Sequence, residues 1–175
     1  RELSLKEIKE IRDYIDEGIE IEAFVHGAMC ISYSGRCLLS NFMASRRSNH
    51  GECAQSCRWE YVISEKSRGE QMPIEQDERG TYILNSKDLN MIRYIDLLAK
   101  AGVTSFKIEG RIKTAYYVAS VVNAYRRAID EYYKNPDNFV VPEELVLDLE
   151  KPSHRMYCTG FYFDDQRAIK KGAGH

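Results

Sequence analysis

The sequence predicts an α/β fold in which parallel strands are flanked by helices. Segments with helical spacing alternate with strand-like segments, and Ala101-Gly102-Val103 forms a short connection from a helix to a strand. Two strand-like runs, which end at Gly27 and Gly110, carry polar side chains on one face just before the glycine. Because active sites of such folds gather at the carboxyl ends of the strands, we expect the functional residues there.

The first helix is predicted over residues 5–17. Ser4 and Glu7 form a capping-box pattern, and isoleucines follow at helical spacing up to Gly18. The next segment is a strand in which apolar and ionisable side chains alternate. Its apolar face holds Ile19, Ile21, Ala23 and Val25, and its second face holds Glu22, Phe24 and His26.

The middle of the chain gives weaker signals. Residues 41–58 show no sustained period and are predicted to form a loop. Short strands are predicted at residues 59–63 and 81–84. A helix capped by Asn85 or Ser86 is predicted next. Its apolar positions are Leu89, Ile92, Ile95 and Leu98.

The last third begins with a strand within residues 103–111. Phe106 and Ile108 lie on one face of this strand, and Lys107, Glu109 and Arg111 on the other. Thr114 opens the longest helix, whose apolar stripe needs a partner surface and which ends near Asn135. An acidic patch and an extended aromatic segment follow. We therefore predict a main domain over residues 1–135, with a linker and the start of a C-terminal region over residues 136–175.

The composition is that of an ordinary globular protein. The 175 residues are 43% hydrophobic with a formal net charge of -2, so no strong charge bias points to a partner. No apolar run approaches the ~20 residues of a membrane span, and no signal peptide is recognisable, so we expect a cytoplasmic protein without a membrane partner. Because the chain begins at Arg1 within a few residues of a helix, we also expect it to be a piece of a longer protein.

Four of the five cysteines cluster between positions 30 and 57. An odd number of cysteines fits a disulfide framework poorly, whereas thiolates are soft ligands that select iron–sulfur clusters or zinc. The candidate ligands are Cys30, Cys37, Cys53 and Cys57. In the zinc alternative, His26 or His50 replaces a thiolate. Cys158 lies in the aromatic segment and is predicted to be a buried apolar side chain.

The polar side chains at the two strand ends are the candidate catalytic residues. They are Glu22 and His26 on the first strand, and Lys107, Glu109 and Arg111 on the second. If the strands are neighbours, these groups converge at one edge of the sheet. The alternative is that Lys107 and Glu109 form a structural ion pair.

Residues 22–40, EAFVHGAMCISYSGRCLLS, resemble the signature of the collagenase-like peptidase family U32. The matching positions are Glu22, Phe24, Gly27, Ala28, Met29, Cys30, Gly35, Cys37, Leu39 and Ser40. The resemblance continues through GECAQSCRWEY, RGTYILNSKDLNMI and SFKIEGRIKTAYYVASVVNAYRRAID, and is greatest to the branch that acts in tRNA modification.

This resemblance implies a TIM-like barrel, of which the chain is the C-terminal part. It implies an iron–sulfur component of a prephenate-dependent route that hydroxylates a wobble uridine of tRNA to 5-hydroxyuridine. It also implies a 4Fe-4S cluster held by the four clustered cysteines, with Glu22 and His26 as acid–base groups. Lys107 and Arg111 would hold an anionic ligand, either a small carboxylate such as prephenate or a phosphate.

A tRNA partner rests on the resemblance, because the net charge gives it no support. Basic side chains would meet phosphates, and aromatic side chains would stack on an unpaired base. The basic candidates are Arg46, Arg47, Arg58, Lys107, Arg111 and Lys113, and the aromatic candidates are Tyr33, Phe42 and Trp59.

Two alternative functions remain open. The family name suggests a peptidase with a peptide substrate, in which Cys30 would be the nucleophile and His26 or His50 its base. The other alternative is a metal-stapled homodimer that binds a peptide or protein without catalysis.

Overall fold

The computed structural model describes residues 2–30, 32, 36–59, 61–64, 71–73, 76–77, 80–81 and 87–163. The chain forms two compact units, which we describe separately. The first, Arg1–Met29 with Lys87–Asp165, is called the sheet unit, and the second, Cys30–Ser86 with Gln166–His175, is called the thiol unit. Within the described residues, none of the helices is long and apolar enough to cross a membrane.

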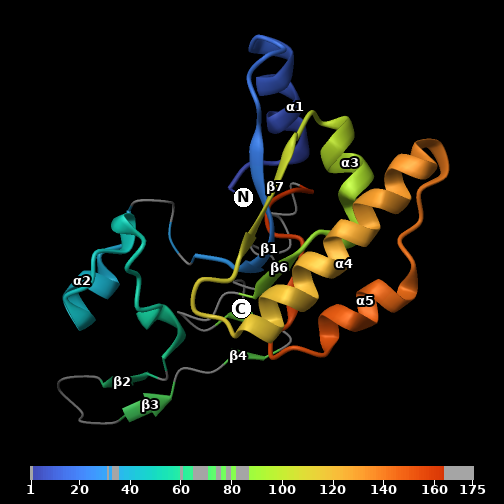
Figure 1. Cartoon of the computed structure of the whole chain (residues 1–175). Helices are drawn as coiled ribbons and strands as arrows, with labels where there is room; N and C mark the ends of the chain where they lie inside the picture. Colours follow the sequence, from blue (N-terminus) through green and yellow to red (C-terminus); the bar gives the residue numbers. More distant parts are fainter. Residues whose placement is uncertain are drawn as a thin grey trace. The chain divides into compact units, whose positions relative to one another are not determined.

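The sheet unit is built on a four-stranded sheet of order β7-β1-β6-β8 (Figure 1). Its strands are β1 (Glu22–Ala28), β6 (Asp88–Asn90), β7 (Ser105–Glu109) and β8 (Tyr157–Cys158). β1 is parallel to β7, and β6 is parallel to β8, but β1 and β6 are antiparallel. The α/β class is therefore confirmed, while the expectation of parallel strands fails at the β1–β6 pairing.

Local signals set the ends of the longest helices. Ser4 caps α1 (Leu5–Tyr14) in a complete capping box with Glu7, although the helix ends before the predicted residue 17. The Thr114 side chain accepts a hydrogen bond from the Tyr117 N–H and so caps α4 (Ala115–Lys134). α4 ends at Lys134, next to Asn135, near which its end was predicted.

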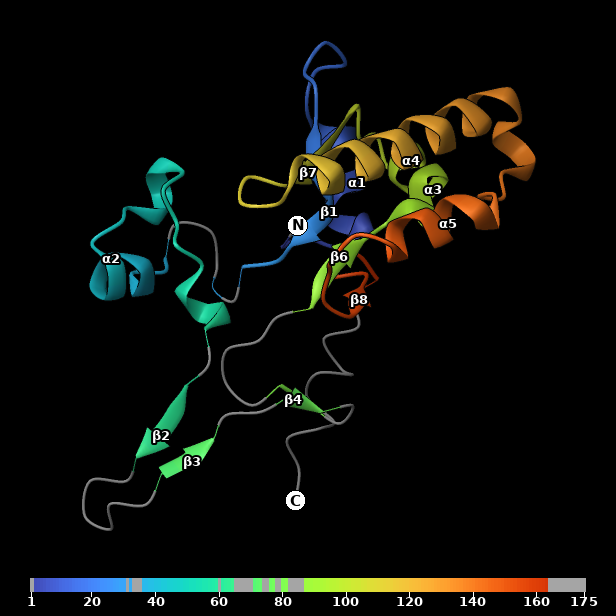
Figure 2. The same cartoon turned by 60° about the horizontal axis from the view of Figure 1, so that its bottom comes forward.

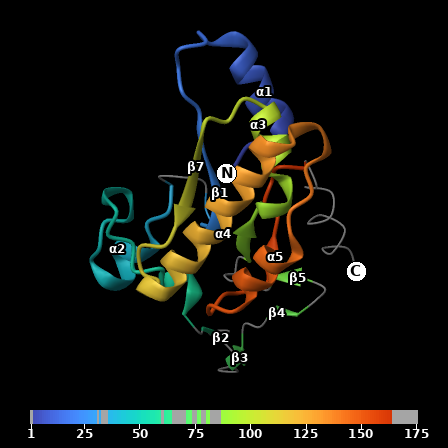
Figure 3. The same cartoon turned by 45° about the vertical axis from the view of Figure 1, so that its right-hand side comes forward.

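Helix α4 packs against both the sheet and α5 (Glu143–Glu150) (Figure 3). The buried Tyr125 hydroxyl of α4 donates to the Val25 carbonyl of β1 at 2.8 Å and accepts from the Met91 N–H at 3.0 Å. Arg127 of α4 pairs with Glu144 of α5. The boundary at residues 135 and 136 stays a prediction, but α5 and β8 lie in the same compact unit as the sheet.

The helix predicted after Ser86 is wrong in its first part. Asp88–Asn90 is a strand, followed by the 3-10 turn η3 (Ile92–Tyr94) and then by α3 (Ile95–Lys100). Leu89 has the spacing of a helical core position, but its strand pairs with β1 and buries it to 1% exposure. A three-residue strand is too short for its period to be read from sequence, so tertiary pairing decided this element.

The loop predicted over residues 41–58 contains regular structure. It includes part of α2 (Leu39–Ala44) and the 3-10 turns η1 (Ser48–His50) and η2 (Ser56–Arg58). Two short hairpins follow, β2 (Val62–Ser64) with β3 (Gln71–Pro73) and β4 (Gln76–Asp77) with β5 (Gly80–Thr81). The predicted strands 59–63 and 81–84 overlap β2 and β5, although residues 82–84 lie outside the described residues.

Candidate functional site

Hydrogen bonds join the loops that carry Cys37, Cys53 and Cys57. The Ser40 hydroxyl at the start of α2 is buried and accepts from the Ala54 N–H at 2.9 Å, next to Cys53. The Ser48 hydroxyl donates to the carbonyl of Cys37 itself at 3.0 Å. These two bonds join segments 11 and 14 residues apart, so the loops are held together without regular sheet pairing.

Two of the cysteine sulfurs accept hydrogen bonds from the backbone two residues later. The Leu39 N–H donates to Cys37 Sγ at 3.4 Å, and the Gln55 N–H donates to Cys53 Sγ at 3.3 Å. Gln55 adopts the left-handed conformation with φ 54°, which is rare for a residue other than glycine. Hydrogen bonds of this kind favour the thiolate form that metals and clusters require.

Cys57 lies within electrostatic range of the other three clustered cysteines. Burial raises the pKa of the Cys57 thiol, the Arg58 guanidinium lowers it, and the thiols of Cys30, Cys53 and Cys37 raise it again. All four side chains are half-buried free thiols, and all four belong to the thiol unit. Cys158 is instead a half-buried residue of β8 in the sheet unit.

The donor set fits a cofactor that is bound by four thiolates. Among the described residues, no three His, Cys, Asp or Glu side chains are arranged to hold one metal ion. A single zinc ion requires sulfurs drawn closely around one centre, whereas a 4Fe-4S cluster binds each sulfur to a different iron and keeps the sulfurs farther apart. Four thiols are a donor set that both groups use, so the identity of the cofactor stays a prediction.

Glu22 and Lys107 meet across the parallel β1–β7 pair. Lys107 Nζ lies 2.7 Å from Glu22 Oε1, and the Ser105 hydroxyl donates to Glu22 Oε2 at 3.3 Å. The hydrogen bond from Lys107 lowers the pKa of the Glu22 carboxyl. Both side chains are about half exposed, so this ion pair contributes little to stability.

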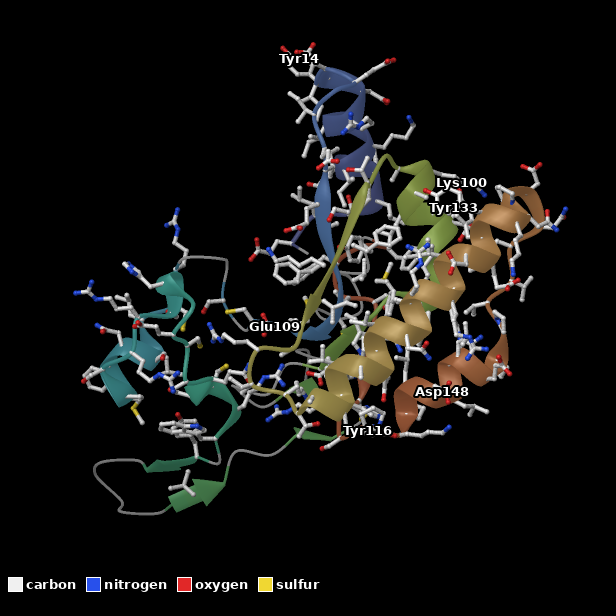
Figure 4. The ribbon with its side chains drawn as sticks, in the orientation of Figure 1. Tyr14, Lys100, Glu109, Tyr116, Tyr133 and Asp148 are labelled. Carbon is white, nitrogen blue, oxygen red and sulfur yellow. The ribbon has the colours of Figure 1, made fainter. Side chains whose placement is uncertain are left out.

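Glu109 and Arg111 lie at the carboxyl end of β7, where Figure 4 labels Glu109. The Arg111 N–H donates to Glu109 Oε1 at 3.0 Å. The alternative prediction of a Lys107–Glu109 ion pair is not what forms, since Lys107 pairs with Glu22 on the neighbouring strand. The catalytic roles of these residues stay predictions.

His26 lies in the interior of the sheet unit. It is 1% exposed, and the rings of Tyr117, Tyr125 and Tyr157 lie 6.0, 5.4 and 5.3 Å from its own. The prediction that it shares a surface with Glu22 fails because the pairing of β1 with β7 shifts between Phe24 and His26. This irregularity interrupts the alternation of the strand, and Val25 and His26 are both buried.

Hydrogen bonding favours one tautomer of His26. The Tyr125 hydroxyl donates to the Val25 carbonyl at 2.8 Å, and its oxygen lies 3.4 Å from His26 Nδ1. With the hydrogen on Nδ1, His26 would donate to this oxygen and Nε2 would be a bare acceptor. Nε2 is buried and has no hydrogen-bond partner within the described residues. A buried acceptor of this kind costs free energy unless a water molecule or a ligand satisfies it.

Asp88 and Lys113 form a buried charge pair near His26 that the sequence analysis did not identify. Asp88 is fully buried on β6, and its Oδ2 lies 3.6 Å from Lys113 Nζ. Lys113 also donates to the Ser153 carbonyl at 3.3 Å and lies 4.7 Å from the Tyr117 ring centre. Asp88 precedes Leu89, which the sequence analysis assigned to a helix, so no local pattern indicated that Asp88 would be buried in a strand.

Burial of His26 predicts an acid-sensitive fold. Loss of hydration lowers the pKa of His26 to about 4 from 6.5, although the nearby Asp88 carboxylate acts to raise it. Between pH 4 and 6.5, the unfolded chain therefore binds more protons at His26 than the folded chain does. As a result, the free energy of unfolding falls as the pH drops from 6.5 to 4. The expected loss is about 3 kcal/mol in total, at about 1.4 kcal/mol per pH unit.

Urea unfolding at several pH values checks this expectation. His26→Gln should remove this part of the pH dependence, whereas the control variant His50→Gln, which changes an exposed histidine, should retain it. An unchanged slope in His26→Gln would show that other groups cause the acid sensitivity.

Comparison with known proteins places these features in a family. Residues 1–172 match Peptidase family U32. The chain is 44% identical to tRNA hydroxylation protein P1 of Bacillus subtilis, with 93% of this chain and 38% of that protein covered. It is 40% identical to tRNA hydroxylation protein P of Escherichia coli, with 92% and 44% covered. It is also 37% identical to a protein named collagenase of Porphyromonas gingivalis, with 93% and 39% covered.

No solved structure matches the chain. The chain spans about two fifths of the length of the curated relatives it matches. The aligned region includes both the sheet unit and the thiol unit, since the family match runs almost from end to end.

Proposed function

We propose, from the premise that this chain belongs to peptidase family U32, that it is the cysteine-bearing part of an enzyme that hydroxylates tRNA. The observation that carries the proposal is the gathering of four half-buried free thiols in one small unit, in a chain about 40% identical to tRNA hydroxylation proteins. The sheet unit would contribute strands to a TIM-like barrel in the longer protein. The product would be 5-hydroxyuridine at the wobble position.

Cys30, Cys37, Cys53 and Cys57 would hold a 4Fe-4S cluster, with zinc as the alternative. When bound, such a cluster supplies single-electron transfer or a site for an oxygen donor. The N–H groups of Leu39 and Gln55 would stabilise the ligating thiolates of Cys37 and Cys53.

The sheet unit would bind and orient the small ligands. At neutral pH, His26 is uncharged and presents Nε2 as a hydrogen-bond acceptor, so it would orient a hydroxyl or an amine. A proton-transfer role would require ligand binding to raise its pKa towards neutrality. Lys107 and Arg111 are both exposed and remain the candidates for a small carboxylate such as prephenate. Lys107 would have to exchange its partner Glu22 for that ligand.

Two measurements test this function in the full-length protein. After anaerobic purification, we expect a brown protein with iron and sulfide in about a 1:1 ratio. We also expect tRNA from cells that lack the gene to lose 5-hydroxyuridine and its derivatives, as measured by nucleoside mass spectrometry. A colourless protein with stoichiometric zinc would refute the cluster, and persistent modification without a paralogue would refute the reaction.

A peptidase is the second candidate, favoured by the relative named collagenase. Cys30 would then be the nucleophile. If Cys30 is the nucleophile, the full-length Cys30→Ala variant should no longer cleave denatured collagen. Unchanged cleavage would reject this role. His26 is a poor partner for a thiolate–imidazolium pair, because its burial disfavours the charged imidazolium.

A further inference from the structure

The thiol unit carries a positive charge that the whole chain does not. Residues 30–59 contain four arginines and no lysine, against one glutamate and no aspartate, which gives a formal charge of +3. The complete chain has a net charge of -2, so the remaining residues carry an excess of negative charge. Within the thiol unit, positive charge is therefore concentrated in residues 30–59, whereas residues 60–86 carry six acidic and three basic residues.

Three of these arginines are exposed. Among the described residues, the guanidinium groups of Arg36, Arg46 and Arg47 have no carboxylate within ion-pair distance. Three exposed arginines of the sheet unit, in contrast, form ion pairs with carboxylates. The pairs are Arg93 with Glu143, Arg126 with Asp130, and Arg127 with Glu144. Unpaired guanidinium groups in one segment are available to an anionic partner.

The same segment exposes large aromatic side chains. Phe42 on α2 is 85% exposed, and Trp59 directly after η2 is 46% exposed. Figure 2 shows α2 and the segments that follow it, viewed after a turn of Figure 1. Exposed rings interspersed with unpaired arginines are typical of surfaces that bind unpaired nucleotides, because rings stack on bases and guanidinium groups contact phosphates.

Two of the other cations predicted to contact RNA have carboxylate partners within the sheet unit. Lys107 pairs with Glu22, and Lys113 lies beside the buried Asp88. Using either for phosphate would leave a carboxylate without its cation, and for Asp88 that carboxylate is fully buried. The charge distribution therefore favours the thiol unit over the strand edge as the source of phosphate contacts.

We propose that residues 36–59 form a surface that binds an RNA loop with unpaired bases. Phe42 and Trp59 stack on bases, and Arg36, Arg46 and Arg47 contact phosphates. This inference rests on the proposed function for the choice of RNA, and it adds where the RNA binds. Cys37, Cys53 and Cys57 belong to the same segment, so the proposed RNA surface and the proposed cofactor ligands share one unit.

The arginines are tested together in the full-length protein. The probe is an unmodified tRNA transcript with a wobble uridine, and its binding is followed by fluorescence anisotropy over a range of salt concentrations. The triple change Arg36→Gln, Arg46→Gln, Arg47→Gln should weaken binding about 10-fold or more and reduce the slope of log K against log salt by about 2. The matched control Arg93→Gln, Arg126→Gln, Arg127→Gln removes the same charge from paired arginines and should change neither quantity appreciably.

The aromatic contact is tested with single substitutions. Phe42→Ala should weaken binding of the tRNA transcript about 5- to 100-fold, and Phe42→Trp should retain it. The control is Tyr14→Ala, since Tyr14 on α1 is 93% exposed and Figure 4 labels it on the sheet unit. Equal effects of Phe42→Ala and Tyr14→Ala would overturn the stacking role.

Failure of this inference can be distinguished from failure of the proposed function. Every variant should retain the iron content of the parent, so a loss of RNA binding cannot be attributed to a lost cofactor. If both arginine triples bind tRNA equally, the surface is wrong even when the tRNA hydroxylation is established. If polyglutamate competes as well as RNA does, the surface recognises acidic protein and the proposal is overturned.

Discussion

Gly27→Ala should destabilise the sheet unit by about 4 kcal/mol or more, enough to leave much of a marginally stable protein unfolded. Gly27 has φ +102°, a conformation that L side chains rarely adopt. A Cβ added there would lie 2.2 Å from the Glu109 carbonyl oxygen and 3.1 Å from the carbonyl carbon. The obstacle is the backbone of β7, which pairs with Gly27 and cannot rotate away.

A matched control separates this effect from the general effect of removing a glycine. Gly18 follows α1, and a Cβ there would meet nothing within 4 Å. Gly18→Ala should change the free energy of unfolding by no more than about 1 kcal/mol. The change arises chiefly because alanine reduces the conformational entropy of the unfolded chain. Urea titration followed by circular dichroism measures both variants. Similar stabilities would mean that β1 and β7 do not approach so closely at this position.

Replacement of any one of Cys30, Cys37, Cys53 and Cys57 by alanine should abolish the bound cofactor. Each sulfur would bind a different iron, so loss of one ligand exposes the cluster to solvent and oxidation. We expect iron content and visible absorbance to fall to background, and tRNA hydroxylation in complemented cells to fall about 100-fold or more. These effects should be accompanied by little change in the sheet unit, because all four residues belong to the thiol unit.

Cys158 provides the control for the cysteine series. It is a half-buried residue of β8 that pairs in register with Leu89, and burial raises the pKa of its thiol. Cys158→Ala should retain the iron and the activity of the parent protein. If one of the four clustered cysteines can be replaced without loss of iron while Cys158 cannot, the proposed ligand set is wrong.

The local structure of this protein is encoded in short stretches of sequence. The capping box of Ser4 and Glu7, the cap at Thr114 and the cysteine spacing are patterns within a few residues, and each was readable without coordinates. The similar polar ends of two strands were also readable, although their pairing as β1 and β7 was only a condition of the prediction. Family membership followed from the pattern of glycines and cysteines in residues 22–40.

Only the tertiary structure decided which distant residues meet. Leu89 lies in a strand and not in a helix because β6 pairs with β1, and Lys107 pairs with Glu22 because β1 and β7 are in this register. His26 became a buried neutral acceptor because an irregularity in β1 turned it away from the alternation that its sequence shows. Periodicity describes one segment at a time, whereas register, burial and ion pairing depend on free energies shared between segments far apart in the chain.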